Sequence, residues 1–268
     1  MRSATPRRHV ATAAAAAVAL LAALLVAACT GGTDEATPEP AAAASGFRVT
    51  NLDDLSGYRF NVQVTLDPEG LDAANIPPGL LQPGQTFGLT LTGAALAPDR
   101  EQSITTFALG DLSLAMESVR VGDRMWTREG DGPWRESAAT DAASPLVAEF
   151  EYRPSAIFRA SEDYSLDDLT ARLGTLTHTM ERVNGHEARR YTMTPDQFRE
   201  VFQSDQEVLP PEAGPDATFI ADLWFAEALG APLRMVIVGQ NGAGQEILRL
   251  EMDMTDLNAP DIAIEPPA

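Results

Sequence analysis

Apolar and polar side chains alternate along most of the chain after position 57. Between Tyr58 and Leu66 every second residue is apolar, and Arg, Asn, Gln and Thr lie between them. A period of two is the pattern of a β-strand that has one apolar face. The pattern recurs in further segments, which we predict to be strands: 87–92, 103–109, 112–121, 124–128, 175–183, 187–193, 219–225, 233–240 and 246–254.

Short turn sequences separate several of these strands. Asn184-Gly185 is the strongest hairpin signal in the chain, because both residue types adopt the positive φ that a two-residue turn requires. Gly122-Asp123 is a second candidate for a tight turn. Successive strands joined by such short turns imply an antiparallel meander.

Three stretches depart from this alternation and have helical spacing. Residues 144–159 place Leu146, Phe150 and Ile157 on one face, and Pro154 should interrupt them, so we expect two short helices. Pro195 stands at the first position of a helix through residue 202, and residues 167–169 are expected to open another. Many strands with a few amphipathic helices indicate an α+β fold, with one curved antiparallel sheet covered by helices on a single side.

The first residues have the features of a bacterial lipoprotein leader. Three arginines precede an apolar run over residues 13–28, which is shorter than the roughly 20 residues of a membrane helix. The run ends in Val26-Ala27-Ala28-Cys29, which matches a lipobox. We therefore expect residues 1–28 to be a signal peptide, and lipid on Cys29 to anchor the protein to the outer face of a cell membrane. The alternative is an ordinary leader with a chance cysteine.

Composition adds a tether and a strong negative charge. Residues 30–46 contain no large apolar side chain, so we expect residues 29–46 to be the lipidated cysteine with a flexible tether, and residues 47–268 to be one domain. The chain has 39 acidic and 19 basic residues, a net charge of −20. This charge argues against a nucleic-acid partner and against electrostatic binding to anionic lipid.

Several motifs from residue 121 onward have an order typical of one family. In chain order they are Val121-Gly122-Asp123-Arg124-Met125-Trp126 with Gly132-Pro133-Trp134, Val183-Asn184-Gly185 with Tyr191, Trp224-Phe225, Gly230-Ala231-Pro232-Leu233-Arg234, and Asn258-Ala259-Pro260 with Ile262. Over residues 57–267 this order resembles the LolA-like lipoprotein-carrier superfamily, especially its LppX/LprG lipoprotein branch. Trp126 stands where that family more often has Tyr.

The resemblance implies a strongly curved, unclosed β half-barrel whose concave face, covered by a few helices, encloses an apolar cavity for acyl chains. The implied cavity lining is Tyr58, Phe60, Val62, Val64, Phe87, Leu89, Leu91, Leu114, Met116, Leu223 and Phe225. The candidate residues of the helical lid are Phe150, Ile157, Phe158, Phe198 and Phe202. For each of these residues, core packing without a ligand is the alternative. Trp126 and Trp134 either mark a cavity mouth or brace one hairpin.

Few residues suit catalysis. Of the three histidines, His9 lies in the expected leader, and His178 and His186 are interpreted as structural. The sequence has no Gly-x-Ser-x-Gly elbow, no His-Glu-x-x-His helix and no glycine-rich phosphate loop. The carboxylates between residues 162 and 168 are of the type that binds Ca²⁺, but their spacing matches no EF-hand loop. We expect no enzymatic activity, no cofactor and no metal.

Two functional hypotheses follow. The first is a lipid-binding lipoprotein, a monomer that carries or holds a lipid or another acylated molecule at the cell envelope. The second is a protein-interaction or sensory module of the envelope on the same scaffold, with a filled core and a protein partner. An undetected hydrolase is a third hypothesis, which converging carboxylates in a cleft would favour.

Overall fold

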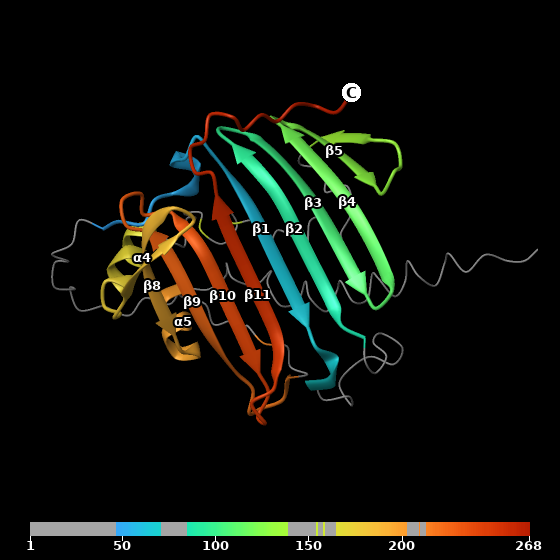
Figure 1. Cartoon of the computed structure of the whole chain (residues 1–268). Coiled ribbons are helices and arrows are strands. Elements are labelled where there is room, and N and C mark those ends of the chain that lie inside the picture. The colour runs from blue at the N-terminus through green and yellow to red at the C-terminus, as the bar shows by residue number, and fades with distance from the viewer. Residues whose placement is uncertain are drawn as a thin grey trace, which may run out of the picture.

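Antiparallel strands form a single curved sheet in the described part of the chain (Figure 1). The computed structural model describes residues 47–70, 85–138, 154, 158, 165–202, 209 and 213–268. The strands among them are β1 (Gly57–Leu66), β2 (Phe87–Leu96), β3 (Arg100–Leu109), β4 (Leu112–Val121), β5 (Arg124–Glu129), β6 (Arg135–Ala138), β7 (Thr179–Val183), β8 (His186–Met193), β9 (Thr218–Ala226), β10 (Pro232–Gln240) and β11 (Glu246–Thr255).

The order of the strands leaves the barrel open. It runs β6-β5-β4-β3-β2-β1-β11-β10-β9-β8-β7, and the end strands β6 and β7 do not pair with each other. The predicted α+β class with an unclosed half-barrel is confirmed.

β1 and β11 lie side by side in the middle of the sheet, although they come from opposite ends of the domain. Val62 pairs with Met252 across these strands, and with Leu91 of β2 on the other side. The sheet therefore consists of two meanders, β1–β6 and β7–β11, and not of one continuous meander. Local turns specify the hairpins, whereas no local pattern specifies the pairing of β1 with β11.

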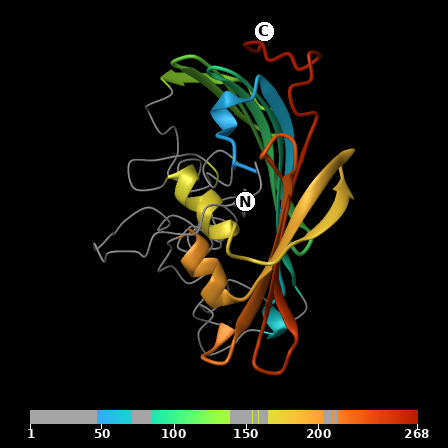
Figure 2. The same ribbon diagram turned by 90° about the vertical axis from the view of Figure 1, so that its left-hand side faces the viewer.

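Two α-helices in the described residues lie on the same side of the sheet (Figure 2). α4 (Leu166–Leu173) is capped by the side chain of Ser165. α5 (Pro195–Phe202) begins with reciprocal hydrogen bonds between Thr194 and Gln197, which form a capping box. Both helices were predicted. The predicted pair over residues 144–159 lies outside the described residues, except for positions 154 and 158. Two 3₁₀ turns, η1 (Leu52–Asp54) and η2 (Pro68–Gly70), flank β1.

The two faces of the sheet differ in character. The concave face carries the main hydrophobic core, with apolar residues at alternate positions of β1, β2 and β8–β11. The convex face of the same strands carries cross-strand ion pairs, such as Arg234 with Asp253 at 2.7 Å. No helix in the described part of the chain is long and apolar enough to cross a membrane.

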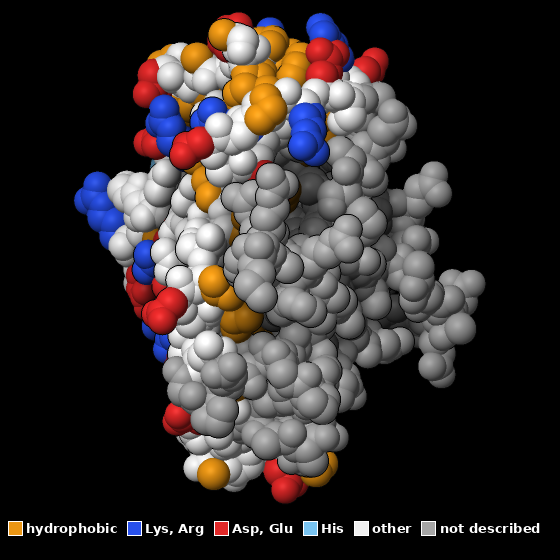
Figure 3. Space-filling view, turned by 90° about the vertical axis from the view of Figure 1, so that its right-hand side faces the viewer, with side chains coloured by type: hydrophobic (Ala, Val, Ile, Leu, Met, Phe, Trp, Pro, Cys, Tyr) orange, Lys and Arg blue, Asp and Glu red, His pale blue; other side chains and the backbone are white. Residues whose placement is uncertain are grey.

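The C-terminal segment packs on the convex face of β2, β4 and β5. Ile262 and Ile264 form a small buried cluster with Val119 and Trp126, and Nη1 of Arg100 donates to the Ile264 carbonyl at 2.9 Å. In Figure 3, hydrophobic side chains gather near the top of the molecule, at the end where this segment lies. Trp126 therefore braces its hairpin against the C-terminal segment and lies on the face opposite to the helices.

Candidate functional site: the concave face of the half-barrel

The structure brings the predicted lining residues to one face of the sheet. Nine of the eleven are buried and belong to a single core cluster: Tyr58, Phe60, Val62, Val64, Phe87, Leu89, Leu91, Leu223 and Phe225. The other two, Leu114 and Met116, lie on β4 on the same face and are half-buried. The period of two was sufficient to place all of them on this face.

The described lid residues pack over β9. Phe158 is fully buried and forms edge-to-face contacts with Phe202 and Phe225, with ring centroids 6.3 and 5.9 Å apart. Phe198 lies 4.6 Å from Phe202 and 5.6 Å from Phe219 by the same measure. The other two lid candidates, Phe150 and Ile157, lie outside the described residues. Aromatic side chains therefore occupy the section of the concave face between α5 and β9.

Burial falls along the concave face toward β4. Val64, Leu89, Phe107 and Leu114 form one row across β1 to β4, because each pairs directly with the next. Val64 and Leu89 are 2% and 1% exposed, whereas Phe107 and Leu114 are half-buried. α5 packs on the same face but against β8 and β9, toward the opposite edge of the sheet. The apolar surface thus continues beyond the tightly packed core to a less covered section at β3 and β4.

The concave face becomes polar at one end of β3 and β4. Glu101, Ser103 and Thr105 are buried there, at positions that alternate along β3. The hydroxyl of Ser103 lies 2.8 Å from that of Ser118, and a guanidinium nitrogen of Arg120 lies 3.7 Å from Glu101. These residues were not predicted from the sequence. Glu101, Ser103 and Thr105 are separated from Phe107 by an even number of positions, so they lie on the same face of the strand.

Two polar atoms of this end lack a partner in the described structure. Nε of Arg120 and Oγ of Ser137 are buried and have no hydrogen-bond partner among the described residues. Arg120 and Ser137 are the direct partners of Met125 in the sheet, and direct partners share a face. Both side chains therefore lie on the concave side, in line with Glu101. Buried polar atoms without a partner are costly, and such atoms are suited to bind a ligand.

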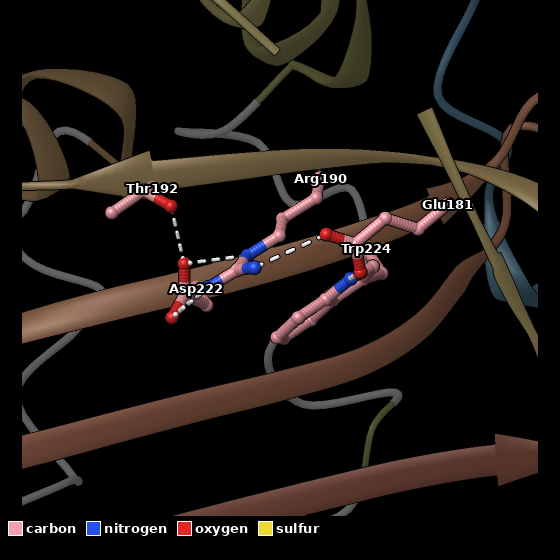
Figure 4. A network of polar contacts seen from close by, with 5 residues as sticks. All are labelled: Glu181, Arg190, Thr192, Asp222 and Trp224. Carbon is pink, nitrogen blue, oxygen red and sulfur yellow. Dashed lines mark hydrogen bonds and ion pairs between the residues drawn. The ribbon is translucent and has the colours of Figure 1, made fainter. Parts of the chain in front are cut away.

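A satisfied polar network lies on the opposite, convex face of β7–β9 (Figure 4). Arg190 binds both carboxylate oxygens of Asp222, at 3.0 and 3.1 Å, and also Glu181 at 3.1 Å. The indole of Trp224 donates to Glu181 at 3.0 Å, and the hydroxyl of Thr192 donates to Asp222. The Trp224 and Arg190 hydrogen bonds lower the pKa of Glu181. Because its members bind one another, this network is a structural clamp for the β7–β8 hairpin.

A second ion pair lies where the N-terminal segment meets the sheet. Arg189 is 8% exposed and binds Glu227 with two nitrogens, and its guanidinium stacks over the ring of Phe47 at 4.4 Å. The Arg189 hydrogen bonds lower the pKa of Glu227, and burial raises the pKa of the neighbouring Tyr191. The ring of His178 contacts that of Tyr191 at a tilt of 47°, with ring centroids 5.5 Å apart.

The described residues contain no cluster of three His, Cys, Asp or Glu side chains that could hold a metal ion. The only predicted calcium-site carboxylates that are described, Asp167 and Asp168, lie in the first turn of α4. Asp167 forms an ion pair with Arg48 at 2.6 Å.

The fold and the concave face define a class of architecture, an open α+β half-barrel. No known family matches the sequence, and no curated protein matches it. The chain is similar to a solved complex of MucA and MucB from Pseudomonas aeruginosa, with a TM-score of 0.27 and 11% identity, over 89% of this chain and 57% of that chain. It is also similar to MucB in complex with MucA(peri), with a TM-score of 0.25 and 14% identity, over 81% of this chain and 59% of that chain.

In both cases the aligned part is less than two thirds of the solved chain.

Proposed function

We propose that this protein is a lipoprotein of the cell envelope that binds the acyl chain of an amphipathic ligand on its concave face, and carries or holds it there. Lipid on Cys29 would anchor it, as the lipobox predicts. The resemblance to the LppX/LprG branch of the LolA-like carriers supports the same function. Binding of this kind requires no catalytic step.

The observation that carries the proposal is the apolar row that ends at β4. Phe107 and Leu114 extend the row begun by Val64 and Leu89, yet they remain half-buried. An alkyl chain that covers the half-buried end of this row, at Phe107 and Leu114, gains about 0.8 kcal/mol for each CH₂ group that it buries. A long chain can therefore bind tightly without any polar contact.

The polar end of β3 and β4 favours a ligand that has both an acyl chain and a polar group over a plain hydrocarbon. Arg120 and Glu101 would lie beside the polar group of a ligand whose chain runs toward Leu114. The hydroxyls of Ser103 and Ser118 offer further hydrogen bonds. Because a buried carboxylate and a guanidinium are both present, the site is not biased toward a purely anionic group.

Photo-crosslinking in living cells tests the proposal on the full chain. A photoreactive benzoylphenylalanine replaces Leu114 in one strain and Ile104 in the other. Ile104 is a matched control because it lies one strand away on the convex face and is 46% exposed. Irradiation should give a lipid adduct on the peptide that contains position 114 and none on the peptide that contains position 104, as read by mass spectrometry.

A second probe position protects the test against a folding defect. The same amino acid in place of Met116, in the neighbouring row, should give the same adduct. Absence of lipid at both positions, in protein whose thermal unfolding matches the wild type, would contradict the proposal, and so would equal labelling at position 104. Mass spectrometry of the N-terminal peptide tests the anchor, and a Cys29→Ala variant should leave the membrane fraction.

A further inference from the structure

β7 is an end strand of the sheet, and its outer edge pairs with no described strand. It forms a hairpin with β8, which lies at the side of the sheet next to α4 and α5 (Figure 1). An end strand offers a row of backbone N–H and C=O groups to any extended segment that can pair with it.

The turn fixes which backbone groups of β7 face outward. Asn184 and Gly185 have φ values of 50° and 85°, and Val183 pairs with His186 directly beside this two-residue turn. The pair next to such a turn exchanges both hydrogen bonds, and along an antiparallel ladder such pairs alternate with non-bonded ones. Val183 and every second residue before it therefore bond to β8, whereas Met180 and Arg182 direct their N–H and C=O groups outward.

The side chains at these two positions are also accessible. Met180 is 49% exposed, and Arg182 is exposed. The intervening residue, Glu181, points to the convex face, where Arg190 and Trp224 hold it. The clamp in Figure 4 thus fixes one face of β7 and leaves its edge and its other face free to bind.

The charge of Arg182 indicates the kind of partner. It makes no ion pair with a described residue, although acidic residues outnumber basic ones by 39 to 19 in this chain. On the same sheet Arg190, Arg234 and Arg249 all have carboxylate partners. A second copy of β7 supplies none on this face, because its residues here are again Met180 and Arg182.

We propose that the outer edge of β7 binds an extended segment of a partner protein by strand addition. The segment pairs with the backbone of Met180 and Arg182. It places an apolar side chain beside Met180 and an acidic one, two residues away, beside Arg182. This interaction does not depend on lipid binding at the concave face.

Synthetic peptides test this edge on the full chain in mild detergent. The probe is a fluorescent, end-blocked peptide of alternating Thr and Val with a central Val-Thr-Glu, and its counterpart has Lys in place of Glu. The Glu peptide should bind in an anisotropy titration and should slow hydrogen exchange of the Met180 and Arg182 amides. The Lys peptide should bind at least about tenfold more weakly.

Three variants separate backbone pairing from side-chain contacts. Met180→Pro removes an N–H that faces away from β8, so the hairpin should persist while peptide binding is lost. Met180→Ala keeps that N–H and should retain most of the binding. Arg182→Glu should bind the Lys peptide more tightly than the Glu peptide. Because this variant should still bind a peptide, the binding itself shows that the variant is folded.

Several outcomes would overturn the proposal. Binding of the Glu peptide that Met180→Pro leaves unchanged would place the peptide elsewhere. Amide protection on β7 that rises with protein concentration in the absence of peptide would identify a second copy as the occupant. Absence of any protection at Met180 and Arg182 at saturating peptide would show that the edge does not accept this class of partner.

Discussion

The indole N–H of Trp224 donates to a carboxylate oxygen of Glu181 at 3.0 Å, although the two residues belong to strands that are not neighbours. β8 lies between them, and its Arg190 binds the other oxygen of Glu181 while its guanidinium stacks on the Trp224 ring at 5.1 Å. The contact ties the end strand β7 to β9. The edge that we propose as a binding surface is therefore held by side chains as well as by the ladder.

Replacement of Trp224 by Phe should loosen this tie. The ring remains as a surface for Arg190, but Glu181 loses one hydrogen bond, so the free energy of unfolding should fall by about 0.5–1.5 kcal/mol. Amides of β7 should exchange faster than those of β10. Trp134→Phe serves as the control, since Trp134 is half-exposed beside Arg128 and should change stability less. Equal exchange on β7 in Trp224→Phe and in the wild type would contradict the role of this bond.

Stability should depend on pH through Glu227. Arg189 lowers the pKa of this carboxyl below its ordinary value of 4.5. A carboxyl whose pKa is lower in the folded state than in the unfolded state stabilises the folded protein. The stabilisation is complete at a pH above the ordinary pKa, and it is lost as the pH falls through the pKa of the folded state. Because the Glu227 side chain is 37% exposed, solvent screens the ion pair, and its contribution should be smaller than that of a fully buried pair.

A Glu227→Gln variant isolates this contribution. Thermal unfolding of the wild type and the variant is compared between about pH 7 and about pH 3. The wild type should be more stable at the upper end, and the difference should shrink as the pH falls below the ordinary pKa of 4.5 and through the lower pKa of the folded state. A difference in unfolding temperature that stays constant over this range would show that the charge of Glu227 is not its source.

Gly230 should tolerate no side chain. Its φ is +64°, and a Cβ atom there would lie 1.7 Å from the carbonyl oxygen of Arg48, in the segment that leads into the sheet. Gly230→Ala should therefore cost more than about 3 kcal/mol, because backbone must move in addition to the strain of the left-handed conformation. Gly244 has φ of +80° and open space around it, so Gly244→Ala should cost only about 1–2 kcal/mol. Chemical denaturation of both variants measures the difference.

Much of the fold could be predicted from alternation and turn chemistry, because both are local properties. Tyr58 and the apolar residues that follow it at every second position lie on one face of β1, and Asn184-Gly185 makes the expected turn. The pairing of β1 with β11 could not be predicted, since it joins residues such as Val62 and Met252 that no local pattern relates.

The site was predictable only in its apolar part. Leu89 and Leu91 follow the rule that apolar side chains face the core, whereas β3 departs from it. Ser103 and Thr105 are buried, while Ile104 between them is 46% exposed. The phase of a strand with apolar residues at both odd and even positions is decided by its neighbours in the sheet, and for β3 it is set by pairing with β2.

The C-terminal segment should be essential to the convex side of the sheet. Ile264 is fully buried against the cluster that contains Trp126, and Ile264→Ala should cost about 2–4 kcal/mol, because it leaves a cavity between the segment and the sheet. Trp126 should then become accessible to water. The tryptophan fluorescence should therefore shift to longer wavelength, and acrylamide should quench this fluorescence more strongly. Ile220→Ala is the matched control, since Ile220 is 52% exposed and its loss should change stability by less than about 0.5 kcal/mol. If both variants unfold at the same denaturant concentration, the segment rests on the sheet without stabilising it.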